Sequence, residues 1–234
     1  MFESEALRRL TPYREILKTH IDNECSSLKN CVELLDKLYK LLQDCEPECM
    51  KIAEERKVDR KQASVAIAGS LFPWGACYIL EKIRDFEKIP VIFSLTKKHE
   101  LVEKYATIRV GSEILKPDMD LLIFSEREDT PLLICSLKTS LRERAGQTHR
   151  WKMVLDIALK CKELKEKYAL NYEVKRDIKF VFITTNFYNE IYQPQQRAMF
   201  RFFDFVYLAR DDIDVIPPVK RLSCIVDDLK EIYK

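Results

Sequence analysis

The sequence predicts an α/β protein in which a mixed central sheet, flanked by helices, follows a helical N-terminal region. Apolar residues recur at the three-four spacing of amphipathic helices up to about residue 70. From about residue 107 the period changes to short apolar runs typical of buried strands, and helical patterns separate the later runs. A chain of 234 residues can form one large domain with a helical extension. We therefore expect a helical region at residues 1–70 and an α/β core at residues 71–234.

The N-terminal region contains one clear amphipathic stretch and several expected breaks. The stretch follows Ser26-Ser27, which suits a helix N-cap, and its apolar positions are Leu28, Val32, Leu35, Leu38 and Leu42. We expect Pro47 to open the next helix and Asp59 to cap the one after it. The turn residues Phe72-Pro73-Trp74-Gly75 should end that helix, and a separate helix should follow at residues 76–86.

The first predicted strands lie between residues 107 and 137. Residues 107–110 alternate between apolar and polar, and a short helix at residues 97–105 precedes them. Leu121 to Phe124 and Leu132 to Leu137 are mostly apolar, and the connection between them is short and charged. These two strands should therefore be antiparallel neighbours.

Helices and strands alternate in the rest of the chain. A helix at residues 151–168 should bury one face, made of Met153, Val154, Ile157, Ala158 and Cys161. A buried strand is expected at residues 180–184, and another at residues 205–208. Helices near residues 195–203 and 227–233 complete the predicted core.

The composition excludes several classes of protein. The charges nearly cancel, at +2 overall, so the chain is not a nonspecific polycation, although a local basic patch remains open. With four glycines it has no glycine-rich phosphate loop, so we expect no nucleotide cofactor. No apolar run approaches a membrane span, and the N-terminus does not resemble a signal peptide. We expect a cytoplasmic protein with no membrane partner, whose eight cysteines are reduced and packed as small apolar residues.

The strand pair carries an acid and a lysine at positions that can meet. Asp118 directly precedes the first strand, and Lys138 ends the second. If the two strands form a hairpin, a divalent metal and an ammonium group come to one phosphate. Mg²⁺ takes one or two carboxylates and keeps several waters, and a lysine adds charge stabilisation. Asp118 and Lys138 are therefore candidate catalytic residues, Asp118 is a candidate Mg²⁺ ligand, and the Leu137 carbonyl is a further one.

These residues also resemble a known family. Pro117-Asp118 with Ser136-x-Lys138 resembles the PD-(D/E)xK nuclease signature, in the SxK variant of one group of type II restriction endonucleases. The run Lys138-Thr139-Ser140-Leu141-Arg142-Glu143-Arg144, with Gln147 beyond it, is similar to the KT-x-x-(K/R)-(D/E)-R-x-x-Q stretch of that group. The resemblance covers about residues 75–152. It implies a restriction-endonuclease-like core and Mg²⁺-dependent DNA cleavage.

The motif does not itself supply the second metal-binding acid of the expected site. Ser136 stands where the signature usually has an acid, and Trp151 stands where this group usually carries a replacement glutamate. The segment Gly75 to Glu81 is similar to the helix that carries an active-site glutamate in many of these folds, which implies that Glu81 is a catalytic and metal-binding residue. The alternatives are Asp156, Glu100, Glu103 and Glu113.

A basic segment follows the proposed site at once. The stretch from Lys138 to Lys152 holds five basic residues and one acid, whereas the whole chain is nearly balanced. This concentration beside the proposed metal site favours contact with the DNA backbone. Arginine can also read guanine through two hydrogen bonds. The candidate DNA-binding residues are Thr139, Ser140, Arg142, Arg144, Gln147, His149 and Arg150.

The resemblance implies a type II restriction endonuclease that takes part in restriction-modification. Such enzymes usually act as homodimers, because a two-fold protein reads a palindrome and cuts both strands. The arginines suggest a short G/C-rich palindrome such as CGCG, and residues 1–70 are expected to form the dimer interface or an arm around the DNA. Two alternatives remain open. One is a repair or junction-resolving nuclease of the same fold, and the other is a DNA-binding module that does not cleave.

Overall fold

The computed structural model describes residues 5–95, 99–172, 176–186 and 189–234. The α-helices are α1 Glu5–Glu24, α2 Leu28–Asp36, α3 Leu38–Glu55, α4 Arg60–Glu87, α5 Glu100–Tyr105, α6 Arg142–Lys160, α7 Lys162–Lys167, α8 Pro194–Phe200 and α9 Ile225–Ile232. Two short 3₁₀ helices are η1 Glu190–Tyr192 and η2 Leu222–Cys224. The strands are β1 Ile92–Ser94, β2 Ile108–Val110, β3 Glu113–Leu115, β4 Leu121–Phe124, β5 Leu132–Lys138, β6 Leu170–Asn171, β7 Ile178–Thr184, β8 Phe205–Leu208 and β9 Val219–Arg221.

A six-stranded mixed sheet forms the centre of the molecule, in the order β1-β4-β5-β7-β8-β9. β1 and β4, and β4 and β5, pair antiparallel, whereas β5, β7, β8 and β9 run parallel. The predicted antiparallel pairing of the first two apolar runs is therefore confirmed, as is the mixed α/β class. A small sheet in the order β3-β2-β6 lies beside the main one.

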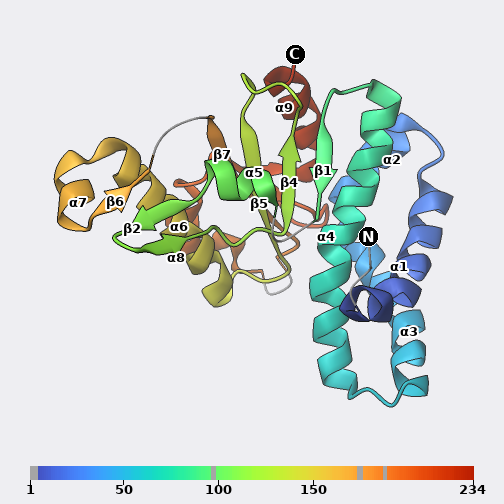
Figure 1. The fold of residues 1–234 in the computed structure, drawn as a ribbon. Coiled ribbons are helices and arrows are strands. Elements are labelled where there is room, and N and C mark those ends of the chain that lie inside the picture. Colours follow the sequence, from blue (N-terminus) through green and yellow to red (C-terminus); the bar gives the residue numbers. More distant parts are fainter. Residues whose placement is uncertain (1–4, 96–98, 173–175, 187–188) are drawn as a thin grey trace.

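The two faces of the main sheet are covered by different helices (Figure 1). Because side chains alternate along a strand, Leu133, Cys135 and Leu137 of β5 pack into one cluster with the helices α1–α4 and α9. Ile134 points to the opposite face, where α6 and α8 contribute Trp151 and Phe200. The N-terminal helices thus share one continuous hydrophobic core with the sheet.

The predicted N-terminal helices are present, but their boundaries differ from the prediction. Ser27 caps α2 as expected, since its hydroxyl accepts a hydrogen bond from the Asn30 N–H. The expected single helix through Leu42 instead breaks at Lys37, where Asp36 accepts hydrogen bonds from the backbone N–H and hydroxyl of Ser223. This contact crosses most of the chain, so local spacing could not reveal it.

Two prolines that were expected at helix boundaries lie inside helices. Pro47 lies within α3, and α4 runs through Pro73 and across residue 70, so the predicted turn at residues 72–75 is wrong. A proline costs a helix one backbone hydrogen bond, but the buried faces of both helices favour continuation. Gly75 does not form a turn: a Cβ there would meet Leu17 Cδ2 at 2.9 Å, so this glycine permits close packing of α1 on α4.

The later elements follow the predicted order. β7, β8, α8 and α9 coincide with the expected strands and helices to within a few residues. α6 begins earlier than expected, at Arg142, and its buried face carries Trp151, Leu155 and Ala158. Met153, expected on that face, is exposed. All eight cysteines are free thiols, six of them buried, and no described helix is long and apolar enough to cross a membrane.

Candidate active site

The hairpin of β4 and β5 brings two segments of the predicted motif to one edge of the sheet. Leu121 at the start of β4 pairs with Cys135 near the end of β5, and the Asp120 N–H donates to the Cys135 carbonyl at 3.0 Å. The residues before β4 therefore lie beside the end of β5. This pairing allows the side chains of Asp118 and Lys138 to meet.

The Lys138 ammonium lies between two carboxylates. Its Nζ is 3.1 Å from Asp118 Oδ2 and 2.7 Å from Asp120 Oδ2. The Lys138 side chain is only 10% exposed and that of Asp120 13%, whereas Asp118 is 33% exposed. The expected meeting of Asp118 and Lys138 is confirmed, and Asp118 is the group that solvent or a ligand reaches most easily.

Asp120 is a member of this cluster that the sequence reading missed. Its Oδ2 accepts a hydrogen bond from the Leu137 N–H at 2.9 Å as well as one from Lys138. One signal could have identified it, because residues two apart in an extended segment point to the same side and Asp120 is two positions from Asp118. Asp120 therefore ties the end of β5 to the start of β4.

The donor set suits a hard divalent cation. Two carboxylates converge on one ammonium, and Mg²⁺ characteristically takes one or two carboxylates while it keeps several waters. In the described parts of the chain, no group of three or more His, Cys, Asp and Glu side chains gathers into a larger metal site. Asp118, with the more exposed carboxylate, is the better placed of the two to hold an ion.

Glu81 lies on α4, the helix that packs against β5. Partial burial raises the pKa of its carboxyl group, and the charged groups that act on it are Arg84 and Asp85 of the same helix. Burial, and after it the charge of Glu81, raises the pKa of Cys77, one turn away. No hydrogen bond or ion pair joins Glu81 to Asp118 or Lys138 among the described residues, so its role stays a prediction.

The alternative acids have other partners or positions. Asp156 accepts hydrogen bonds from Lys152 and Lys160 on α6, and Glu103 forms an ion pair with Lys116. Glu100 begins α5, and Glu113 lies on the exposed strand β3. The structure thus brings Asp120, rather than one of these acids, to Asp118.

Ser136 has a structural contact instead of a place in the acid cluster. It is fully buried, and its hydroxyl accepts a hydrogen bond from Thr148 Oγ1 at 3.0 Å. Thr148 belongs to α6, so this bond joins the middle of the basic helix to β5. Trp151, one turn further on, packs on Phe180 of β7 as a core residue.

The predicted DNA-binding residues lie in the turn after β5 and on α6. Thr139 and Ser140 are half-buried in the turn, and Arg150 is exposed on the helix. The His149 ring packs edge-on against Phe202 with ring centroids 4.4 Å apart, and burial lowers its pKa. The side chains of Arg142, Arg144 and Gln147 lie outside the described part of the structure.

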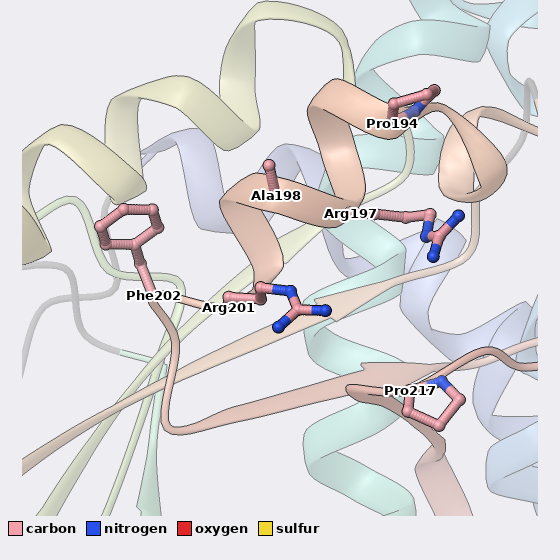
Figure 2. Close-up of a pocket in the computed structure, with 6 residues that line it drawn as sticks. All are labelled: Pro194, Arg197, Ala198, Arg201, Phe202 and Pro217. Carbon is pink, nitrogen blue, oxygen red and sulfur yellow. The ribbon is translucent and has the colours of Figure 1, made fainter.

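A groove that Phe202 helps to line opens between α8 and the segment before β9. Its volume is about 550 Å³, and Figure 2 shows Arg197 of α8 and Arg201, which directly follows this helix, above Pro217. The groove contains none of the predicted site residues. Phe202, which lines the groove, also contacts His149 of α6.

Comparison with known proteins identifies the family. Residues 94–229, more than half of the chain, match the family model described as "BsaWI restriction endonuclease type 2", and this range contains the cluster at the strand edge. The chain therefore belongs to this family of type II restriction endonucleases, which confirms the predicted resemblance to type II restriction endonucleases.

A curated relative points the same way. The chain is 26% identical over 151 residues to the "Putative type II restriction enzyme MjaVIP" of Methanocaldococcus jannaschii. The aligned part is 60% of this chain, and the chain spans about three fifths (61%) of the relative's length.

Proposed function

We propose that this protein is a Mg²⁺-dependent type II restriction endonuclease that hydrolyses phosphodiester bonds of double-stranded DNA. The observation that carries the proposal is the Lys138 ammonium shared between Asp118 and Asp120 at the edge of the sheet. An ammonium beside a cation-binding carboxylate is the pair of charges that a scissile phosphate needs. Family membership supports DNA as the substrate.

Each side chain has a distinct role in the proposed reaction. Asp118 would hold the metal ion, together with the Leu137 carbonyl and with Glu81 if the substrate-bound form brings α4 closer. When bound, Mg²⁺ supplies an activated water and charge stabilisation. Lys138 would donate to a non-bridging oxygen of the phosphate and so stabilise the charge that develops there. Asp120 would keep the Lys138 ammonium aimed at this point, and the products would carry 5′-phosphate and 3′-hydroxyl ends.

The basic segment is proposed to hold the DNA. The residues that would contact the duplex are Thr139, Ser140, Arg142, Arg144, Gln147, His149 and Arg150. Arginine and glutamine pair with base edges in the major groove, which supports a short G/C-rich palindrome such as CGCG. A homodimer would read this site by two-fold symmetry, with residues 71–234 as the nuclease core and residues 1–70 as the dimer interface or a DNA-embracing arm.

The test is digestion of phage DNA with Mg²⁺, followed by mapping of the ends. Wild-type protein should give discrete fragments, and Asp118→Ala and Lys138→Ala should each abolish cleavage while DNA binding persists. Smeared or junction-only products would indicate a repair-type nuclease, and binding without any cleavage would indicate a DNA-binding module. Cleavage that survives either substitution would show that the site is assigned wrongly. Sedimentation of the protein with its DNA site tests the dimer.

A further inference from the structure

A buried polar network joins the ends of three parallel strands beside the candidate active site. Asn186, which follows β7 and has a positive φ of 52°, accepts hydrogen bonds through Oδ1 from the N–H groups of Glu190 and Ile191. Arg210, which follows β8, donates to the Asn186 carbonyl at 3.1 Å and to Asn189 Oδ1 at 2.9 Å. Asn186, Glu190 and Arg210 are all buried. The network therefore ties Asn186, Asn189 and Glu190 together after β7.

Two residues after β7, Thr185 and Glu190, contact the segment that follows Lys138. Glu190 Oε2 accepts a hydrogen bond from the Leu141 N–H at 2.9 Å, and both groups are buried. Thr185 Oγ1 donates to the Thr139 carbonyl at 3.3 Å. Two residues of the β7 loop thus bind the backbone of the three-residue turn between Lys138 and α6.

Leu141 is the N-cap residue of α6, and its side chain offers no hydrogen-bond acceptor. The first N–H groups of a helix need acceptors from outside it, and a carboxylate there also interacts favourably with the helix dipole. Glu190 supplies this acceptor from a distant part of the chain. Since α6 carries most of the basic segment, its starting position sets where the basic residues lie relative to Lys138.

We propose that Glu190 is a positioning residue that sets the register between the Lys138 ammonium and the DNA-reading helix α6. The inference rests on the proposed function, because it concerns how recognition by α6 is joined to cleavage at Lys138. Glu190 itself touches neither the substrate nor the reacting atoms. Its loss should weaken recognition of the cognate site more than the general affinity for DNA.

The experiment separates the reach of the side chain from its charge. Glu190→Gln keeps an acceptor oxygen at the same distance from Leu141, whereas Glu190→Asp keeps the charge but is one methylene too short. Cognate and unrelated duplexes are titrated with Ca²⁺ in place of Mg²⁺, and KM and kcat are measured with Mg²⁺. Glu163→Gln, an exposed glutamate on α7, is the matched control.

Glu190→Asp should raise KM and the cognate Kd about 10-fold, because α6 would no longer be held in register with Lys138, with nonspecific Kd changed less than about 2-fold. Glu190→Gln should stay within about 3-fold of wild type, and the control should match wild type. A purely structural role would lower the thermal midpoint of Glu190→Asp but leave the ratio of cognate to nonspecific affinity unchanged, and that result overturns the inference. If wild-type protein shows no cognate site at all, the proposed function fails instead.

Discussion

At the scale of single residues, the arrangement around Lys138 combines chemistry with structural support. A long ammonium side chain buried at a strand end requires anionic partners, because an unpaired buried charge is very costly. Asp118 and Asp120 supply them, and Asp120 also binds the Leu137 N–H. The two acids therefore differ: Asp118 is open to a ligand, whereas Asp120 is engaged in holding the strand.

Asp120→Ala should lower the free energy of unfolding by about 1–3 kcal/mol, because the part-buried Leu137 N–H and the Lys138 ammonium both lose an acceptor. Urea unfolding followed by circular dichroism measures the change. Asp129→Ala is the control, because its ion pair with Arg127 lies on the surface, where solvent screens it and it should contribute little to stability. Equal stability of the two variants would contradict the assigned role of Asp120.

Glu81 should make stability depend on pH. Burial raises its pKa above the ordinary value of 4.5, so the folded state holds the proton more tightly than the unfolded state does. Stability from this group is therefore fully present below pH 4.5 and is lost as pH rises through the raised pKa. Glu81→Gln should raise the thermal midpoint at pH 7 and have a smaller effect at pH 4. A gain that is the same at both pH values would argue against a raised pKa.

At the scale of elements, two glycines of α4 have opposite surroundings. A Cβ at Gly75 meets the side chain of the fully buried Leu17, whereas in the described part of the chain nothing lies within 4 Å of a Cβ at the exposed Gly69. The same residue type thus serves the packing of α1 at one position and has no packing role at the other.

The same substitution at both glycines should therefore change stability in opposite directions. Gly75→Leu should destabilise the fold by about 1–3 kcal/mol through overpacking against α1. Gly69→Leu should stabilise it by about 0.5–1 kcal/mol, since leucine favours a helix over glycine. Chemical denaturation of the two variants gives both values. A stable Gly75→Leu variant would mean that α1 does not pack closely on α4.

At the scale of the whole molecule, a nearly neutral chain carries a basic segment on one helix. Between Lys138 and Lys152 there are five basic residues and one acid, against +2 for the whole protein. The helix that holds them begins beside the acid–lysine cluster and is anchored to the sheet through Ser136 and Glu190. The helix α6 therefore carries most of the basic segment and is also held in place by buried hydrogen bonds.

DNA affinity should fall steeply with salt, and Arg150→Ala should reduce the slope of log K against log salt by about 0.9, the value for one phosphate contact. Arg150 is exposed on α6, so the change should leave the fold intact. Fluorescence anisotropy with a labelled duplex at several salt concentrations measures the slope. Lys162→Ala, at the start of α7, should leave it unchanged, and an unchanged slope for Arg150→Ala would remove this residue from the interface.

The sequence by itself determined the α/β class, the order of most elements and the meeting of Asp118 with Lys138. These features depend on hydrophobic periodicity and on one short hairpin, and both are local properties of the chain. Local rules failed where packing outweighed propensity, as at Pro47 and Pro73, which lie inside helices that bury a broad apolar face.

Only the tertiary structure decided which groups support the pair of Asp118 and Lys138. Asp120 binds the Leu137 N–H across the hairpin, and Glu190 of η1 accepts a hydrogen bond from the Leu141 N–H. Hydrogen bonds between such distant residues leave no periodic trace in a sequence, because they depend on how the strands are ordered in the sheet. The position of the basic helix relative to Lys138 is therefore a property of the folded molecule, set by buried polar contacts that form only when β5, β7 and β8 lie side by side.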